Sequence, residues 1–235
     1  MMSSTVANAF YLENPVPYAE MAVAQERFVA ARMADAIGDA VFFLEHLPVV
    51  TLGRRGVTAS LVKSPRSLAS RGISFSQSTR GGDVTYHAPG QIVMYPILKL
   101  TGREADVHCY THALEEIAIR TAASFKVEAF RRDGMTGAWT QHGKLAAIGV
   151  RLKRWVTSHG MSFNVNPDLA GFESIVPCGL RNERVTSVEA ILGEDCPSLI
   201  DVRESMALHF SDVLGRTLKV RRMSGTTFLR NSSAM

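Results

Sequence analysis

The sequence predicts one α+β domain, and three observations lead to this fold class. The chain has 235 residues, a length at which one or two domains are expected. Apolar residues recur at helical spacing near both ends, whereas short runs rich in β-branched and aromatic residues fill the middle. These strand-like runs do not alternate regularly with helices, so a doubly wound parallel sheet is disfavoured. Neither a repeat nor a low-complexity linker divides the chain, and residues 1–235 are therefore interpreted as a single domain.

Three segments are predicted to be helices. Residues 18–33 are rich in Ala, Met, Gln and Glu, which favour helix. Asp106 is a candidate N-cap for a helix that ends near Ser124, and residues 198–214 place their apolar side chains on one side. Strands are predicted at residues 40–45, 49–52, 84–86, 92–96, 127–130, 137–140, 145–152, 156–164 and 217–222. A turn at 88–90 indicates a hairpin-like connection between two of them, and residues 231–235 are expected to form a frayed tail.

Composition and charge exclude several classes of protein. Hydrophobic residues make up 46% and charged residues 20% of the chain, which is typical of a globular protein and not of a disordered one. The net charge of +4 is too small to indicate nucleic-acid binding, although it favours an acidic partner. No signal segment and no apolar run of about 20 residues is visible, so a cytoplasmic location without membrane contact is expected. The three cysteines, Cys109, Cys178 and Cys196, are spaced too widely for a disulfide framework or a CxxC metal site.

The most informative segment covers residues 80–96. Two glycines follow an arginine at 80–82, and their missing Cβ atoms would let the backbone approach a ligand closely. On a short strand, Thr85 and His87 would share one face and Tyr86 would point the other way. A tight turn beside a hydroxyl-rich strand is the alternative interpretation of this pattern.

Two further positions carry reactive side chains. Lys144 opens a nearly all-apolar segment, and burial there would lower the pKa of its ammonium and make it available for proton transfer. Cys178 stands between a proline and a glycine, which predicts a constrained turn where an exposed thiol can be a nucleophile. Each has a simpler interpretation, a strand-end lysine that reaches water and a small core cysteine. Cys109 lies in a predicted helix and Cys196 follows two carboxylates that disfavour a thiolate, so neither is the candidate nucleophile.

In combination and order, these segments resemble the lipoyl(octanoyl) transferase family. The long family signature is matched in the first segment by Arg80, Gly81, Gly82, Thr85, Tyr86, His87, Gly90 and Gln91. Shorter family segments are matched at Gly143-Lys144 with Ile148-Gly149, at His159-Gly160 and at Pro177-Cys178-Gly179. The resemblance covers about residues 15–215. Asp83 and residues 45–48 depart from commoner family forms, which affects the detail of the pocket and not the reaction class.

The resemblance implies an α+β fold with a mixed sheet around an acyl pocket, similar to biotin and lipoate protein ligases. It implies the first step of protein lipoylation, in which an octanoyl group passes from octanoyl-acyl carrier protein to a specific lysine. The implied acceptors are the lipoyl domains of 2-oxoacid dehydrogenases and the glycine cleavage H protein, and the step uses neither a cofactor nor a metal. By the same resemblance, Cys178 is the nucleophile and Lys144 is its partner in a Cys/Lys dyad. The implied substrate-binding residues are Arg80, Gly81, Gly82, Asp83, Val84, Thr85, Tyr86, His87, Ala147, Ile148, Gly149, Gly160, Met161 and Ser162.

This chemistry suits the side chains that are present. A thiol exchanges readily with a thioester and gives an acyl-enzyme close in energy to the donor. A free thiol is only about 3% thiolate at pH 7, and a nearby ammonium raises that fraction. A desolvated Lys144 would accept the proton of the attacking lysine, and backbone N–H groups near Cys178 would stabilise the oxyanion. Residues 145–150 and the glycines at 81–82 are expected to line a slot that discriminates chain length by only about 0.8 kcal/mol per methylene.

Three other functions compete with this interpretation. An ATP-dependent lipoate or biotin protein ligase of the same fold would also use a lysine, although the sequence has no GxxxxGK[ST] phosphate loop. A non-enzymatic binding module, for a carrier protein or for nucleic acid, would need only a basic surface. A cysteine hydrolase would need a histidine near the thiol, and the candidates are His46, His87, His142 and His159.

A docking surface for an acidic carrier protein is the last expectation. Its candidates are Arg131, Arg132, Arg151, Lys153, Arg154, Arg221 and Arg222. If these charges steer the carrier, the reaction slows as salt rises, because ions screen exposed charges. Solvated charges without a partner are the alternative.

Overall fold

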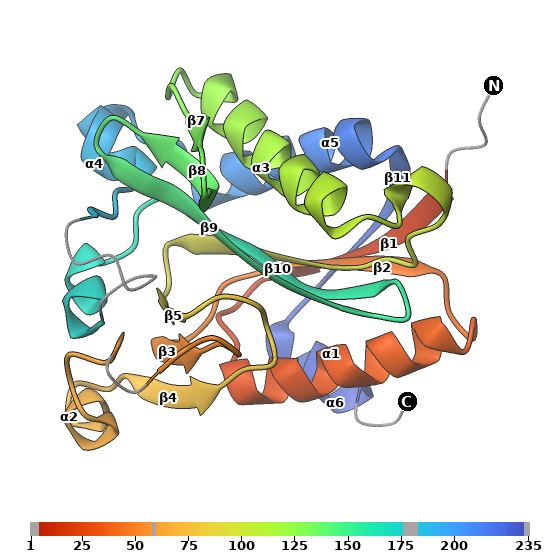
Figure 1. The fold of residues 1–235 in the computed structure, drawn as a ribbon, viewed down its shortest axis with the longest axis horizontal. Coiled ribbons are helices and arrows are strands. Elements are labelled where there is room, and N and C mark those ends of the chain that lie inside the picture. The colour runs from red at the N-terminus through yellow and green to blue at the C-terminus, as the bar shows by residue number, and fades with distance from the viewer. Residues whose placement is uncertain (1–4, 58–59, 176–182, 233–235) are drawn as a thin grey trace.

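An eight-stranded mixed sheet forms the centre of the molecule (Figure 1). The computed structural model describes residues 5–57, 60–175 and 183–232. The strands of this sheet are β1 (Thr5–Leu12), β2 (Asp39–Leu44), β6 (Gln91–Ile97), β7 (Phe130–Arg132), β8 (Met135–Thr140), β9 (Gly143–Lys153), β10 (Val156–Asn164) and β11 (Arg216–Met223). Their order is β11-β1-β2-β6-β10-β9-β8-β7. β1 runs parallel to β2 and β11, and the other neighbours are antiparallel.

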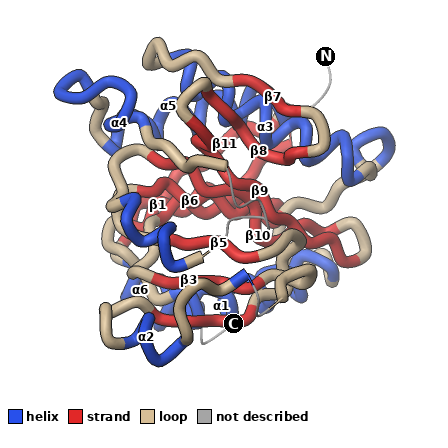
Figure 2. The backbone as a smooth tube through the Cα atoms, turned by 60° about the vertical axis from the view of Figure 1, so that its left-hand side comes forward, coloured by secondary structure: helices blue, strands red, loops and turns tan. Residues whose placement is uncertain are grey.

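A second sheet of three strands lies beside the large one (Figures 1 and 2). It consists of β3 (Val49–Leu52), β4 (Ser74–Gln77) and β5 (Val84–His87), with β3 in the middle. The short helix α2 (Pro65–Ala69) packs on it through the fully buried Leu68. This sheet therefore has a small apolar core of its own, separate from the two cores that cover the large sheet.

The hairpin predicted around residues 88–90 is wrong, because the two strands belong to different sheets. β5 pairs with β3, whereas β6 pairs with β2 and β10. Gly90, at φ +93°, donates its N–H to the Glu45 carboxylate at 2.6 Å, and its carbonyl accepts the N–H groups of Val165 and Asn166. These bonds fix the turn on the large sheet, so it joins two sheets and not two paired strands.

Helices cover both faces of the large sheet (Figure 1). α3 (Val107–Ser124) and α5 (Leu199–Leu214) pack on one face, and α1 (Tyr18–Met33) and α6 (Gly225–Ser232) on the other. The predicted N-cap of α3 is confirmed, since the Asp106 carboxylate accepts the N–H of Cys109 at 2.8 Å. Over the residues that the structure describes, no helix is long and apolar enough to cross a bilayer. The shorter helical elements are η2 (Gly102–Glu104), η3 (Leu169–Ser174), α4 (Val188–Leu192) and η5 (Gly193–Asp195).

Two assignments at element ends need correction. The strand predicted at 127–130 begins only at Phe130, because Val127 donates its N–H to the Ala122 carbonyl at 3.1 Å and completes the end of α3. Residues 231–232, expected in a frayed tail, end α6, whose Phe228 packs under the large sheet. Neither α6 nor β1 is among the predicted elements. The three predicted helices and the α+β class are confirmed.

Candidate active site

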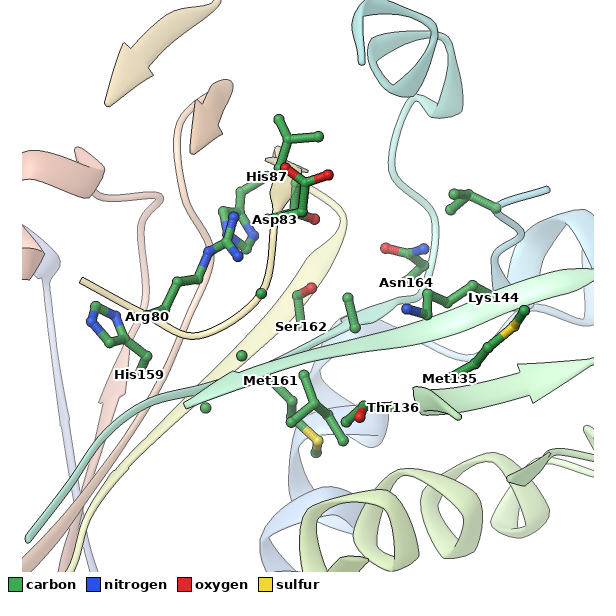
Figure 3. A pocket seen from close by; sticks show the side chains of 18 of the residues that line it. Arg80, Asp83, His87, Met135, Thr136, Lys144, His159, Met161, Ser162 and Asn164 are labelled. Atoms are coloured by element: carbon green, nitrogen blue, oxygen red, sulfur yellow. The ribbon is translucent and has the colours of Figure 1, made fainter. Parts of the chain in front are cut away.

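A cavity of about 450 Å³ lies between the two sheets (Figure 3). Strands β9 and β10 form one wall, and β5 with the loop 80–83 forms the other. This volume falls in the range of small-molecule sites. Most of the residues expected to bind substrate line it: Arg80, Gly82, Asp83, Val84, Thr85, His87, Ala147, Ile148, Gly149, Gly160, Met161 and Ser162.

The other two expected residues, Gly81 and Tyr86, lie behind the wall. The N–H of Gly81 donates to the Val150 carbonyl at 2.9 Å and ties the loop to β9. The ring of Tyr86 points into the core of the small sheet, where it meets Phe172 edge-on at a centroid distance of 5.3 Å. Its neighbours Thr85 and His87 face the cavity, which confirms the predicted alternation along this strand.

Arg80 anchors the loop from inside the protein. Its side chain is 8% exposed, and Nη2 donates to the carbonyl of Thr51 at 2.7 Å and to the hydroxyl of Thr51 at 3.0 Å. The opposite wall approaches closely at Gly149, where a Cβ would lie 2.9 Å from the carbonyl oxygen of Gly81. A glycine at position 149 is therefore required for the loop to pack against β9.

Lys144 lies at the other end of the cavity from Arg80 (Figure 3). It is 8% exposed, so the prediction that this lysine opens a buried strand is confirmed. Its Nζ stands 4.8 Å from the centre of the Trp139 ring, a cation–π contact. Its backbone N–H donates to the Arg184 carbonyl at 2.8 Å, and its carbonyl accepts the N–H of Thr186 at 3.0 Å. The lysine is thereby fixed to the chain that follows residue 182.

Cys178, the expected nucleophile, lies outside the described residues. On either side of this gap, Phe172 and Val185 both line the cavity, and Val185 forms a bridge with Lys144. The chain therefore re-enters the described structure beside the lysine. Of the other cysteines, Cys109 is exposed. Burial and the carboxylate of Glu189 raise the pKa of the Cys196 thiol, so a thiolate is disfavoured there, as predicted. The carboxylate responsible is Glu189 and not one of the two that precede Cys196 in sequence.

His46 is a buried histidine behind the cavity. Its Nδ1 lies 2.9 Å from the carbonyl oxygen of Val16, which only accepts, so we assign the proton to Nδ1. Its Nε2 then accepts the hydroxyl proton of Tyr95 at 2.8 Å. Burial lowers the pKa of His46 to about 4, which keeps the ring neutral.

His87 lines the cavity and also has a defined tautomer. Gln91 donates from Nε2 to the Tyr86 carbonyl at 3.1 Å, and this bond turns its Oε1 toward Nδ1 of His87, also at 3.1 Å. Nδ1 therefore carries the proton, and Nε2 is an acceptor. Burial lowers the pKa of His87 well below its ordinary value, and the positive charge of Arg80 acts in the same direction. His87 offers the cavity a neutral acceptor and not a cation.

His159 closes the Arg80 end of the cavity from β10 (Figure 3). Its backbone has the left-handed φ of +57°, and its N–H donates to the side-chain oxygen of Gln25 at 2.9 Å. Its Nε2 is 2.9 Å from the Thr79 hydroxyl, whereas Nδ1 is buried without a hydrogen-bond partner in the described structure. Burial, with Arg80 and Arg151 adding to it, lowers the pKa of His159 to about 3.

The apolar slot differs in part from the expectation. Ala147, Ile148 and Gly149 line the cavity, but Leu145, Ala146 and Val150 do not line it and belong to an apolar core of the large sheet. The expected site residues also omit several lining residues, namely Arg55, Tyr95, Gly134, Met135, Thr136, Trp139, His159, Asn164, Phe172 and Val185. They come from elements far apart in the chain, and no local spacing connects them. Within the described ranges, no group of three His, Cys, Asp or Glu side chains could hold a metal ion.

This fold and this cavity match a known class of protein. Residues 17–211 match the family model of the lipoyl protein ligase A/B catalytic domain, so the chain belongs to this family. Among its curated relatives are proteins named octanoyltransferase, and the predicted resemblance is thereby confirmed. The relative from Chloroflexus aurantiacus is 42% identical over 203 residues, which cover 85% of this chain and 91% of the relative. The relative from Geobacter metallireducens is 45% identical over 194 residues, which cover 83% and 87%.

Solved structures confirm the predicted fold. A lipoate-protein ligase A bound with ATP has a TM-score of 0.74 at 15% identity, covering 96% of this chain and 94% of its own. The bi-partite lipoate protein ligase of Thermoplasma acidophilum also scores 0.74 at 15% identity and covers 96% and 91%. The biotin protein ligase of Aquifex aeolicus, in complex with biotin and ATP, scores 0.54 at 12% identity and covers 88% and 70%. At these identities the likeness concerns the fold alone.

Proposed function

We propose that the protein is an octanoyltransferase of lipoate biosynthesis, which moves an octanoyl group from octanoyl-acyl carrier protein to a lysine of lipoyl domains. The observation that carries the proposal is the identity of 41–45% to octanoyltransferases over most of the chain. The 2-oxoacid dehydrogenase lipoyl domains and the glycine cleavage H protein are the proposed acceptors. The cytoplasm stays the predicted location.

The proposed reaction has two steps at Cys178. In the first, the Cys178 thiolate attacks the carbonyl carbon of the donor thioester, the bond to the carrier sulfur breaks, and Lys144 gives its proton to the leaving thiolate. In the second, the amine of the acceptor lysine attacks the acyl-enzyme, the bond to Cys178 breaks, and Lys144 takes the proton that the amine loses. The cysteine and the lysine then return to their starting protonation states, so the cycle is balanced.

The position of Lys144 supports this scheme. The side chain reaches the cavity from a buried strand, and its backbone is bonded to residues 184–186, which follow Cys178 closely in sequence. The aromatic face of Trp139 accommodates the ammonium in a setting with little water. A thiolate beside this ammonium is stabilised by the opposite charge.

The remaining wall of the cavity supports an acyl chain as ligand. Ile148, Met161 and Met135 are apolar, and the glycines at 149 and 160 leave room between the strands. His87 and His159 are neutral, so neither adds a charge that an apolar tail would desolvate. These residues support an acyl chain that leads away from Lys144.

Mass spectrometry with purified octanoyl-acyl carrier protein tests the proposal. We expect one octanoyl adduct on Cys178, which a lipoyl domain then removes. Cys178→Ser should abolish the adduct, Lys144→Met should slow both steps at least 100-fold, and Cys109→Ser is the matched control that should react normally. Transfer that requires free octanoate and ATP, and that survives in Cys178→Ser, would identify a ligase instead and overturn the proposal.

A further inference from the structure

Residues 46–82 form a segment without a single carboxylate. They contain six of the 26 basic residues of the chain and none of its 22 acidic residues. The six are Arg54, Arg55, Lys63, Arg66, Arg71 and Arg80. We call this segment, which contains β3, α2 and β4, the basic module. The excess of basic over acidic residues is therefore concentrated in this segment.

The basic module borders the cavity on two sides. On one side, Arg54 and Arg55 donate their N–H groups to the carbonyls of Arg80 and Gly82 at 3.0 and 3.1 Å, and Arg55 lines the cavity. On the other side, Lys63 donates its N–H to the Ser174 carbonyl at 3.2 Å. The Arg71 guanidinium donates to the Ser174 hydroxyl at 3.1 Å, close to the last residue described before Cys178.

The cations of the basic module other than the buried Arg80 are accessible. Arg54, Arg55, Arg66 and Arg71 are exposed, and no carboxylate in the described ranges forms a salt bridge with them or with Lys63. Val57 and Val62, each 58% exposed, add apolar surface between the charges. A surface that combines free cations with exposed apolar side chains is typical of an interface.

Four of the seven cations expected from the sequence differ in this respect. Arg131 pairs with two glutamates of α3, Arg132 with Glu183, and Arg151 with Glu26. Arg222 pairs with Glu204. These cations are partly neutralised within the chain, so they attract an acidic partner less than the basic module does.

We infer that the basic module is the docking surface for the acidic carrier protein that delivers the acyl thioester. This inference rests on the proposed function. The carrier must bring its thioester to the cavity, and its acidic face and the phosphodiester of its prosthetic arm complement the cations around the entrance. The acceptor instead presents a lysine ammonium, which the cations of the module repel. The charge of the module therefore favours the donor as its partner.

Two triple variants with the same change of charge test the inference. Arg54→Gln/Lys63→Gln/Arg66→Gln removes three cations of the basic module. Lys219→Gln/Arg221→Gln/Arg230→Gln removes three cations of β11 and α6 that form no salt bridge with another described residue. With octanoyl-acyl carrier protein at low salt, we expect the first variant to raise KM about tenfold and to lose most of its salt dependence, with kcat unchanged. The second variant should behave like the original protein.

A small uncharged donor, the octanoyl thioester of N-acetylcysteamine, distinguishes docking from chemistry. Both variants should use it at the original rate, because it makes no contact with the module. Equal effects of the two variants, or an increased KM for the lipoyl domain in place of the carrier, would overturn the inference. If the original protein accepts octanoyl from neither donor, the proposed function fails, and that result is separate from any effect of the variants.

Discussion

At the scale of single residues, His159 lies between the cavity and a second groove of the protein. It lines the cavity and also a groove of about 450 Å³ between α1 and residues 77–79. Lys144 and His159 stand at opposite ends of the cavity (Figure 3). Along β9, the rise from Lys144 to Gly149, which pairs with Gly160 beside the histidine, is on the order of 16 Å. If an acyl chain attached near Lys144 runs along β9, we expect the imidazole of His159 to close the far end of its path.

We expect His159→Gly to shift the preference of the enzyme toward longer acyl chains. Glycine adopts the left-handed φ of this position without strain, so the backbone is preserved while the imidazole is removed. At about 0.8 kcal/mol per methylene, two extra methylenes that enter the groove change the ratio of decanoyl to octanoyl transfer roughly tenfold. Competition between the two carrier-bound donors, read by mass spectrometry of the product, measures this ratio.

Arg154→Gly is the matched control for this substitution. Arg154 also has a left-handed φ, of +50°, but lies in the turn between β9 and β10 and is exposed. Arg154→Gly should leave the ratio of decanoyl to octanoyl transfer unchanged. If His159→Gly lowers transfer of both donors equally, the histidine does not limit the acyl chain.

At the scale of elements, the start of β9 and the chain after residue 182 hold each other in place. Gly143, at φ +137°, lies so close to Arg184 that a Cβ would stand 2.5 Å from its carbonyl oxygen. This contact accompanies the hydrogen bonds that Lys144 exchanges with Arg184 and Thr186. The geometry of the proposed dyad therefore depends on the absence of one methyl group.

We expect Gly143→Ala to reduce octanoyl transfer by at least tenfold although both proposed catalytic residues are intact. The methyl group must displace the backbone of Arg184, and with it the chain that leads to Cys178. Gly102→Ala is the control, because Gly102 also has a positive φ, of +54°, but has open space around it. Stability from urea unfolding and transfer rates would be compared for both variants. If Gly143→Ala and Gly102→Ala lose stability and transfer rate to the same extent, the structural explanation is contradicted.

The sequence predicted the elements whose structure is decided by a local signal. It did not predict those that are decided by the pairing of strands far apart in the chain. The cap at Asp106 and the period-two pattern at Thr85 and His87 are local, and both agree with the structure. The turn at 88–90 carries turn residues, but which strands it joins depends on β2 and β3, and no spacing within the turn encodes these partners. β1 is fixed in the same way by β2 and β11 on its two sides.

At the scale of the whole molecule, the site is assembled from both sheets. Motif residues such as Gly149 and Ser162 were predictable because they stand in continuous family segments. Trp139 and Tyr95 were not, since they reach the cavity only through the pairing of β8 with β9 and of β6 with β10.

Buried neutral histidines give the whole molecule a dependence on pH. His46 and His159 have pKa values of about 4 and about 3 in the folded protein, compared with about 6.5 in an unfolded chain, and the pKa of His87 is also lowered. Between pH 6.5 and 4 the unfolded chain therefore binds protons that the folded protein does not bind. The unfolding free energy therefore decreases as the pH is lowered through this window. The stabilisation that these histidines contribute is fully present only above about pH 6.5.

We expect His46 and His159 each to contribute a slope of about 1.4 kcal/mol per pH unit near pH 5, since each takes up about one proton on unfolding. His46→Asn should lower the slope of the unfolding free energy against pH by this amount, whatever it does to stability at pH 7. His112→Gln, on the exposed surface of α3, is the matched control and should leave the slope unchanged. Urea unfolding at pH 4.5, 5.0, 5.5 and 6.0, a series chosen within the window of these pKa values, measures the slopes. Equal slopes for His46→Asn and the original protein would mean that His46 is charged in the folded state, which its hydrogen bond to Tyr95 does not allow in the assigned tautomer.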